Sequence, residues 1–414
     1  MNTREKTILL AIVTAFLLFI GYSIEAQEDP EGVLVSSRKA ASLLPPFTFD
    51  PGNALYATVY GYLSVKKIEV AQRVDELIVP GMSKSVPIKF VLQDHPAPLV
   101  VVLLGISGDA SSDFSKLWPL WFSEAGYNVL TFDSFFRSEF IEHNGRDIGI
   151  SGNVFSESSK AADIIAAFLD RYKERITPTK FGLVGMSYGG IQSLILGQMA
   201  VEGKLPFKID AIQAYSPPID LRETAQIIDD WYNQYRFKYT LIEMYQKVAQ
   251  HHLDRGQDGL PDDLLKASIA TSFEQELGKS VLATDQSFKL HLFSEDPYQR
   301  KDEAALWGFM RFAYDLSLPW WRERLNSTDI DEMTASARLD KLLQNQPACS
   351  EAILAADDPF NRPVDVNVIR EDNLKSKLTI LPRGGHLGYI SAPWTRAKLL
   401  TLFDCSDEHR NKAR

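Results

Sequence analysis

One stretch of the chain decides the fold: Phe181-Gly182-Leu183-Val184-Gly185-Met186-Ser187-Tyr188-Gly189-Gly190. An apolar run, typical of a buried strand, leads to a serine between glycines, and a helical pattern follows over Ile191–Ala200. Glycines two positions before and after a serine permit the sharp turn that exposes a nucleophilic hydroxyl. The stretch therefore predicts that Ser187 is a nucleophile at a helix N-terminus, where N–H groups face a developing oxyanion. The alternative is an ordinary glycine-rich turn.

Strand and helix patterns alternate on both sides of this stretch. Apolar runs of strand length occur at Leu99–Leu104, Asn128–Phe132, Ile209–Ala214, Ala352–Ala356 and Leu378–Leu381. Helical spacing occurs at Ser159–Tyr172 and at about residues 392–403. Alternating strands and helices predict an α/β fold with a mostly parallel central sheet.

The alternation is interrupted between residues 221 and 347, which read as helical and are rich in aromatic residues. We expect a large helical cap there, inserted before the strand that carries the catalytic acid. The α/β core would then comprise residues 86–220 and 348–406. Because the insert follows the end of a strand, some of its aromatic side chains should line the substrate pocket.

The N-terminus has the pattern of a secretory signal over residues 1–26. Arg4 and Lys6 precede the uncharged segment Thr7–Tyr22, and Ala26 precedes a polar stretch. We expect cleavage after Ala26 and a periplasmic or secreted protein; the alternative is an uncleaved anchor that holds the protein near a membrane. Residues 27–85 are expected to form a lead-in and antiparallel strands. Strand patterns lie at Ala54–Val70 and, where the core begins, at Pro87–Leu92.

Two later segments supply partners for Ser187. His386 lies in Gly384-Gly385-His386-Leu387-Gly388, just after a predicted strand, and Asp357 and Asp358 follow another. In nucleophile-elbow enzymes the acid and then the base follow the serine along the chain. We predict that His386 is the general base and that Asp358, directly before Pro359, orients it. Asp357 is the alternative acid, and a structural role in the loop is the alternative for His386.

An oxyanion hole needs two N–H donors. Tyr188, directly after the nucleophile, supplies one in such a turn. The second is assigned to Ile106 in Gly105-Ile106-Ser107-Gly108, which follows the first buried strand. A simple glycine turn is the alternative for this loop.

Composition narrows the range of partners. The chain has 44 Lys and Arg residues and 54 Asp and Glu residues, which give a formal net charge of −10. The cationic residues are not clustered along the sequence. Because binding to nucleic acid requires clustered cations that neutralise phosphates, we predict no nucleic-acid partner. No zinc-spaced cluster and no phosphate-binding glycine loop occurs, so we predict no metal and no cofactor. Cys349 and Cys405 can form one disulfide in an oxidising compartment. The oligomeric state is not indicated.

The ordered serine, aspartate and histidine resemble those of the α/β-hydrolase superfamily. Ala356-Asp357-Asp358-Pro359-Phe360 and Gly384-Gly385-His386-Leu387-Gly388-Tyr389 are similar to motifs of its YheT-like branch of esterases and lipases. Leu104 stands where that branch usually has a histidine. The resemblance covers residues 86–220 and 348–406.

This resemblance implies an α/β-hydrolase fold and a serine hydrolase that cleaves a carboxylic ester, or a related small acyl compound with an apolar part, without a cofactor. A peptidase or acyltransferase using the same triad is one alternative. A non-catalytic binding protein with a hydrolase fold is the other.

Overall fold

An eight-stranded sheet forms the centre of the computed structural model, which describes residues 44–65, 67–253, 259–325, 337–371, 374 and 377–405. The spatial order is β1-β2-β4-β3-β5-β6-β7-β8. The strands are β1 Arg73–Leu77, β2 Val86–Val91, β3 Leu99–Leu103, β4 Asn128–Phe132, β5 Phe181–Met186, β6 Ala211–Tyr215, β7 Ser350–Ala355 and β8 Leu378–Leu381. β2 is antiparallel to both of its neighbours, and every pair from β4 to β8 is parallel. The predicted mostly parallel α/β sheet is confirmed, and this arrangement is that of the α/β-hydrolase fold.

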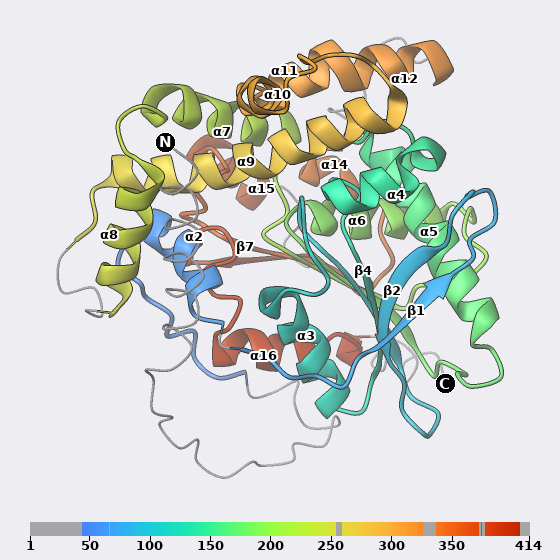
Figure 1. Ribbon diagram of the computed structural model, residues 1–414. Coiled ribbons are helices and arrows are strands. Elements are labelled where there is room, and N and C mark those ends of the chain that lie inside the picture. Colours follow the sequence, from blue (N-terminus) through green and yellow to red (C-terminus); the bar gives the residue numbers. More distant parts are fainter. Residues whose placement is uncertain are drawn as a thin grey trace.

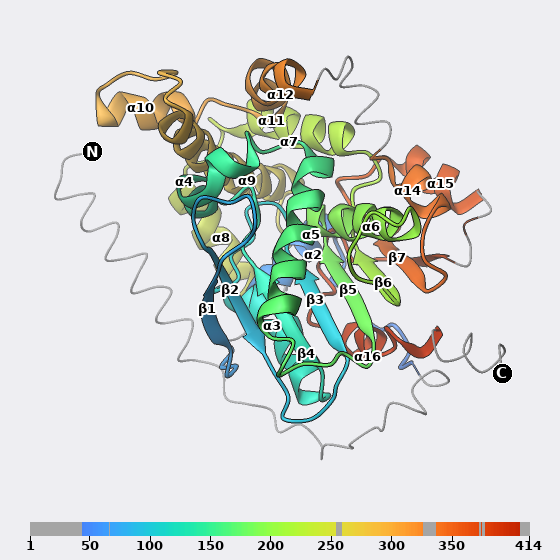
Figure 2. The same ribbon diagram turned by 90° about the vertical axis from the view of Figure 1, so that its right-hand side faces the viewer.

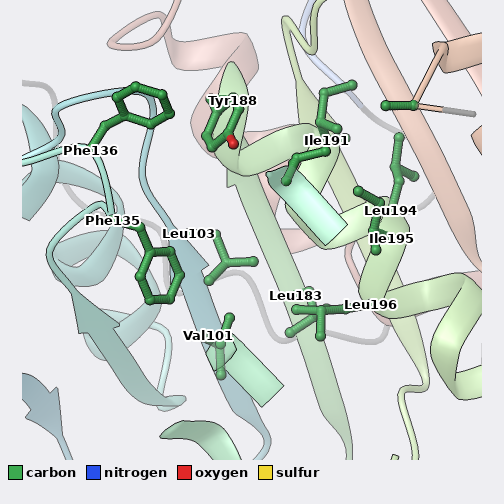
Figure 3. Close-up of a cluster of buried hydrophobic side chains, with 14 of the residues drawn as sticks. Val101, Leu103, Phe135, Phe136, Leu183, Tyr188, Ile191, Leu194, Ile195 and Leu196 are labelled. Atoms are coloured by element: carbon green, nitrogen blue, oxygen red, sulfur yellow. The ribbon is translucent and has the colours of Figure 1, made fainter. Parts of the chain in front are cut away.

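Helices cover both faces of the sheet, which is why its central strands read as continuous apolar runs. α3 (Asp113–Glu124) and α16 (Pro393–Leu400) lie on one face, while α5 (Val154–Arg171) and α6 (Tyr188–Val201) lie on the other (Figure 1 and Figure 2). Alternate side chains of each strand enter opposite cores. In Figure 3, Val101 and Leu183 of the sheet face the α6 side chains, so α6 and its first residue are fixed against the strands.

The described residues between β6 and β7 form helices without strands. They are α7 Leu221–Tyr235, α8 Leu241–Leu253, α9 Asp262–Phe288, α10 Pro297–Ala304, α11 Phe309–Arg311, the π-helix η2 Phe312–Ser317, α12 Leu318–Leu325 and α14 Leu339–Gln344. Figure 1 shows α7 and α9–α12 crossing above one end of the sheet. The long α9 packs on α7 and on α4 (Ser138–Ile148) of the core. This part of the chain is the stretch that the sequence predicts to be a helical insert.

The predicted strand at Ala54–Val70 is wrong, because residues Ala54–Leu63 form helix α2. The Asn53 side chain accepts hydrogen bonds from the N–H groups of Leu55 and Tyr56, which caps the helix. The residues of α2 include many strand formers, but α2 packs against α9, and such packing overrides a weak β-propensity. The antiparallel partners of β2 are instead β4 and β1. The exposed edge position of β1 leaves little hydrophobic pattern to read.

One further sequence expectation concerns the N-terminus, and another concerns the two cysteines. The signal or anchor predicted over residues 1–26 lies outside the described residues. Within the described part, no helix combines the length and the hydropathy needed to cross a membrane. Cys349 and Cys405 form a disulfide, the possibility that the sequence leaves open, and it links the start of β7 to the segment after α16. Helix α15 (Pro363–Glu371) lies between β7 and β8 in the chain.

Candidate active site

Ser187 occupies the sharp turn between β5 and α6. Its backbone has φ 51° and ψ −118°, in a region that non-glycine residues rarely adopt, and its N–H donates to the Tyr215 carbonyl at 2.8 Å. A Cβ on Gly185 would collide with the carbonyl of Gly189, and one on Gly189 with the Leu103 carbonyl. The glycines flanking the serine are therefore required by close backbone approach, as the sequence motif predicts.

The structure brings Ser187, His386 and Asp358 together at the carboxyl edge of the sheet. Ser187 Oγ lies 2.9 Å from His386 Nε2, and His386 Nδ1 lies 2.9 Å from Asp358 Oδ2. His386 is 4% exposed and Asp358 2%. With the imidazole protonated at Nδ1, it donates to the carboxylate and its Nε2 accepts from the serine hydroxyl. That tautomer is the one a general base needs.

The neighbouring Asp357 has a different environment. Its Oδ1 accepts the N–H of Gly385 at 2.9 Å, so it supports the histidine loop rather than the imidazole. Burial raises the pKa of this half-buried carboxyl above its ordinary value. Asp358 Oδ1 in turn accepts the Phe360 N–H at 3.0 Å. The preference for Asp358 over Asp357 therefore agrees with the geometry.

The histidine loop is held by residues that sequence reasoning missed. The His386 N–H donates to Thr58 Oγ1 of α2 at 2.9 Å, and the Leu387 N–H donates to Ser216 Oγ at 3.2 Å. The Phe360 ring packs edgewise on the imidazole with ring centres 4.7 Å apart. No local signal marks Thr58, because its role depends on α2 forming a helix 328 residues away in the chain.

The two predicted oxyanion donors border the same space as Ser187. Ile106 and Tyr188 both line the cavity that contains the serine. Tyr188 opens α6, and N–H groups in the first turn of a helix have no intrahelical acceptor. A Cβ on Gly105 would lie 3.5 Å from Ser187 Cβ, so the loop after β3 lies directly against the turn. This placement suits a two-donor oxyanion hole.

A carboxyl group with no exposed surface, Glu157, lies behind the turn. Its oxygens accept the Tyr188 hydroxyl at 2.7 Å, the Gly152 N–H at 2.7 Å and the Gln192 amide at 3.3 Å. Burial raises its pKa to about 7. Figure 3 shows Tyr188 and Phe136 above the core, and their rings meet edge to face at 5.6 Å. Sequence reasoning missed Glu157, although an acid on the apolar face of a helix is a signal that could have found it.

Two cavities meet at the serine and the histidine, and Ile106, Ser187, Phe273, Phe360 and His386 border both. The first, here called the apolar arm, has a volume of about 150 Å³. Its wall includes Phe136, Val154, Leu221, Ala225, Ile228, Phe309 and Phe312. The second, here called the polar arm, has a volume of about 640 Å³. Much of its wall is also apolar and includes Leu63, Met244, Val248 and Ile269. Its name refers to the polar and charged side chains that it carries in addition, which are Ser107, Asp109, Arg137, Glu139, Ser272, Glu276 and Lys279. Aromatic residues from the helical segment between β6 and β7, among them Phe273, Phe309 and Phe312, thus line the apolar arm.

Among the described residues, His, Cys, Asp and Glu side chains nowhere gather in the groups of three that hold a metal ion. The chemistry available at this edge of the sheet is that of a hydroxyl, an imidazole, a carboxylate and backbone N–H groups. Such a set can attack an acyl carbon, move one proton and stabilise an oxyanion.

Comparisons with known proteins find similar structures but no similar sequence. No protein-family model and no curated protein matches the chain. Carboxyl esterase 2 of the fungus Tuber melanosporum is 15% identical, with a TM-score of 0.43 and coverage of 82% of this chain and 87% of the other. An esterase of Pyrococcus furiosus is 14% identical, with a TM-score of 0.44 and coverage of 80% and 89%.

An acylaminoacyl peptidase of Pyrococcus horikoshii is 10% identical, with a TM-score of 0.40 and coverage of 83% of this chain and 42% of the other. At this identity and overlap, the likenesses say nothing about the substrate of this chain. The YheT-like branch stays a prediction.

Proposed function

We propose that this chain, with its α/β-hydrolase fold, is a serine hydrolase that cleaves carboxylic esters through an acyl-enzyme. The observation that carries the proposal is the continuous contact from Ser187 Oγ through the imidazole of His386 to Asp358, with 2.9 Å at each step. This contact borders a cavity with a mostly apolar wall. A nucleophile, a base and an acid oriented in this way are the groups that acyl transfer requires.

The first half of the reaction forms the acyl-enzyme. Ser187 Oγ attacks the ester carbonyl carbon while His386 Nε2 takes the hydroxyl proton. The N–H groups of Ile106 and Tyr188 hold the oxyanion, and Asp358 stabilises the imidazolium. His386 then gives the proton to the alcohol oxygen as the bond between that oxygen and the acyl carbon breaks. The alcohol leaves, and the acyl group stays bonded to Ser187.

The second half releases the acid by the same groups. Water replaces the alcohol beside His386, which takes one of its protons as the oxygen attacks the acyl carbon. The same N–H groups hold the second oxyanion. The proton returns to Ser187 Oγ when the acyl–serine bond breaks, so that the enzyme is restored and a carboxylic acid is released.

The test is hydrolysis of p-nitrophenyl esters by Ser187→Ala. We expect kcat to fall by about 10³ or more, because removing the nucleophile of a triad leaves only binding and oxyanion stabilisation. Ser193→Ala is the matched control, because Ser193 is a buried serine of α6 whose hydroxyl donates to the Gly190 carbonyl. Near-normal activity of Ser187→Ala would refute the proposal.

The same assay separates the alternative activities. Faster hydrolysis of aminoacyl amides than of matched esters would identify a peptidase, and transfer of the acyl group to an added alcohol in preference to water would identify an acyltransferase. A folded protein that neither turns over these substrates nor reacts with an acylating probe would be a binding protein.

We also propose that the protein functions outside the cytoplasm. The signal pattern of residues 1–26 supports this, as does the Cys349–Cys405 disulfide, because disulfides persist in oxidising compartments. The mass of the protein recovered from expressing cells tests the proposal. A chain that begins at Gln27 is expected, and retention of residues 1–26 would indicate the uncleaved anchor instead.

A further inference from the structure

The two arms of the site offer different partners to a substrate. In the apolar arm, Thr224 Oγ1 already donates to the Phe360 carbonyl at 3.0 Å, and Ser317 Oγ donates to the Ser151 carbonyl at 2.7 Å. Apart from exposed Arg222, the remaining wall away from the reacting groups is largely apolar. A polar substituent placed deep in this arm would lose hydrogen bonds to water without replacing them, whereas a hydrocarbon chain would gain from burial.

The charges in the polar arm are unevenly balanced. Three acids line it, Asp109, Glu139 and Glu276, against two cations, Arg137 and Lys279. Both cations are already paired: Arg137 with Asp109 at 2.6 Å and Glu139 at 2.8 Å, and Lys279 with Glu276 at 2.5 Å. An anionic group entering this arm meets cations that are neutralised and one acid in excess. The arm therefore disfavours negative charge.

Aromatic rings add to this preference. Tyr62 and Phe114 stack with ring centres 4.3 Å apart, and both line the polar arm together with Tyr245. The faces of such rings attract cations. Tyr62 is 55% exposed and Tyr245 56%, so the polar arm opens to solvent along this rim.

The order of events at the serine distinguishes the arms further. The alcohol must leave before water can attack the acyl-enzyme, so its arm must admit water, whereas the acyl group stays in place through both steps. The polar arm, with charged side chains in its wall and an exposed rim, meets the first requirement. The apolar arm, with its largely apolar wall, can hold a hydrocarbon acyl group through both steps.

We propose that the acyl group of the substrate lies in the apolar arm and the alcohol in the polar arm, and that the natural substrate is an ester of an aliphatic acid with an alcohol that is neutral or cationic. This inference rests on the proposed ester hydrolase function, and it identifies the wall formed by α7 and η2 as the part of the cap that selects the acyl chain.

The acyl side is tested with esters of one alcohol and straight acyl chains of increasing length. We expect kcat/KM to rise by up to about fourfold for each added methylene until the arm is full, and then to fall. Ala225→Phe, which fills part of the apolar arm from α7, should move the optimum to shorter chains. Ser272→Phe, in the polar arm, should not. A shift produced by Ser272→Phe alone would overturn the orientation.

The alcohol side is tested with butanoate esters of choline, 3,3-dimethylbutanol and glycolate, which carry a positive, no and a negative charge. At low salt we expect the glycolate ester to react at least about fivefold more slowly than the neutral ester, and high salt should narrow the gap. Glu276→Lys should also reduce the difference in rate between the glycolate ester and the neutral ester. Glu174→Lys, an equal change of charge at an exposed residue that borders neither arm, should leave it unchanged. Preference for the glycolate ester would overturn the proposal.

Labelling with a small fluorophosphonate separates failure of this inference from failure of the proposed function. If Ser187 is labelled and esters are hydrolysed but the two preferences are reversed, the orientation is wrong and the hydrolase function stands. If Ser187 is not labelled and no ester is hydrolysed, both the substrate orientation and the proposed hydrolase function are wrong.

Discussion

The two aspartates that follow β7 differ in what their carboxyl groups contact. Asp358 meets the imidazole of His386, whereas Asp357 accepts the N–H of Gly385. We expect Asp358→Asn to lower kcat by about 10³ to 10⁴, because an amide favours the wrong imidazole tautomer. Asp357→Asn should change kcat by less than about tenfold, because its amide oxygen can still accept the backbone N–H. Steady-state kinetics on one ester decide between them, and a larger loss in Asp357→Asn would reverse the assignment.

Glu157 gives a prediction about stability and pH. Its pKa is raised from an ordinary value of 4.5 to about 7, so between these pH values the folded protein keeps a proton that the unfolded chain releases. Stability from this group therefore falls as the pH rises through that window, by about 3 kcal/mol in all, and the full cost remains above pH 7.

Glu157→Gln removes this titration and retains an acceptor for the Gly152 N–H. Relative to this variant, the wild type should lose about 3 kcal/mol of unfolding free energy between pH 4.5 and pH 8. Urea unfolding of both proteins at the two pH values measures the difference. If the difference in unfolding free energy between the wild type and Glu157→Gln is the same at both pH values, the Glu157 carboxyl titrates alike in the folded and unfolded chains.

Residue by residue, the predictable part of the site is the part with a local pattern. Ser187, Asp358 and His386 each follow an apolar run and lie within two residues of a glycine or a proline, so the sequence marks them. Thr58 contacts His386, and Glu157 contacts Tyr188 beside the nucleophile, each across distant elements. No local pattern marks Thr58, and only the position of an acid on the apolar face of its helix marks Glu157.

Among the elements, α2 has the most direct effect on the site. Thr58, 3% exposed, accepts the His386 N–H, and a Cβ on Gly61 of the same helix would touch the Leu387 carbonyl. Thr58→Val keeps the shape but leaves that buried N–H without its acceptor, at a cost of about 1–3 kcal/mol. We expect lower stability in urea and lower kcat.

Thr58→Ser restores the hydroxyl and should recover most of the activity. If Thr58→Val and Thr58→Ser behave alike, the hydroxyl does not position the histidine loop.

Strands and helices differed in how far the sequence could place them. β4 has the bounds that its apolar run predicts, because a strand buried between two helical layers carries a continuous signal. In the segment that forms α2, the abundance of aromatic and β-branched residues predicted a strand, although tertiary packing and the Asn53 cap make it helical. The intrinsic preference of these residues for a strand contributes little free energy, so tertiary packing overrides it.

At the scale of the whole molecule, the Cys349–Cys405 disulfide closes the chain around the last two strands. The cysteines are 56 residues apart, and this segment includes Asp358 and His386. Replacing both by serine should lower the unfolding free energy by about 2–4 kcal/mol, because the unfolded chain gains freedom. Ester turnover below the unfolding transition should be unchanged. Urea titrations with and without reductant measure the effect, and no change on reduction would show that the bridge adds nothing to stability.

For the molecule as a whole, the helical segment between β6 and β7 is the part whose packing the sequence does not predict. Helical spacing and aromatic content predict a helical insert over residues 221–347, but not which side chains face the serine. That depends on how α7, α9 and η2 pack on one another, and their apolar residues could serve equally as cap core or pocket wall. The structure places Ala225, Phe273 and Phe312 at the site.

The most direct test of the proposed catalytic site is peptide mapping of the protein after reaction with a fluorophosphonate, which reacts preferentially with an activated serine hydroxyl. We expect a single stoichiometric adduct on Ser187, which His386→Ala should slow by orders of magnitude because the base is gone. An adduct on a different serine, or labelling of Ser187 that proceeds equally fast without the imidazole, would contradict the proposed catalytic apparatus.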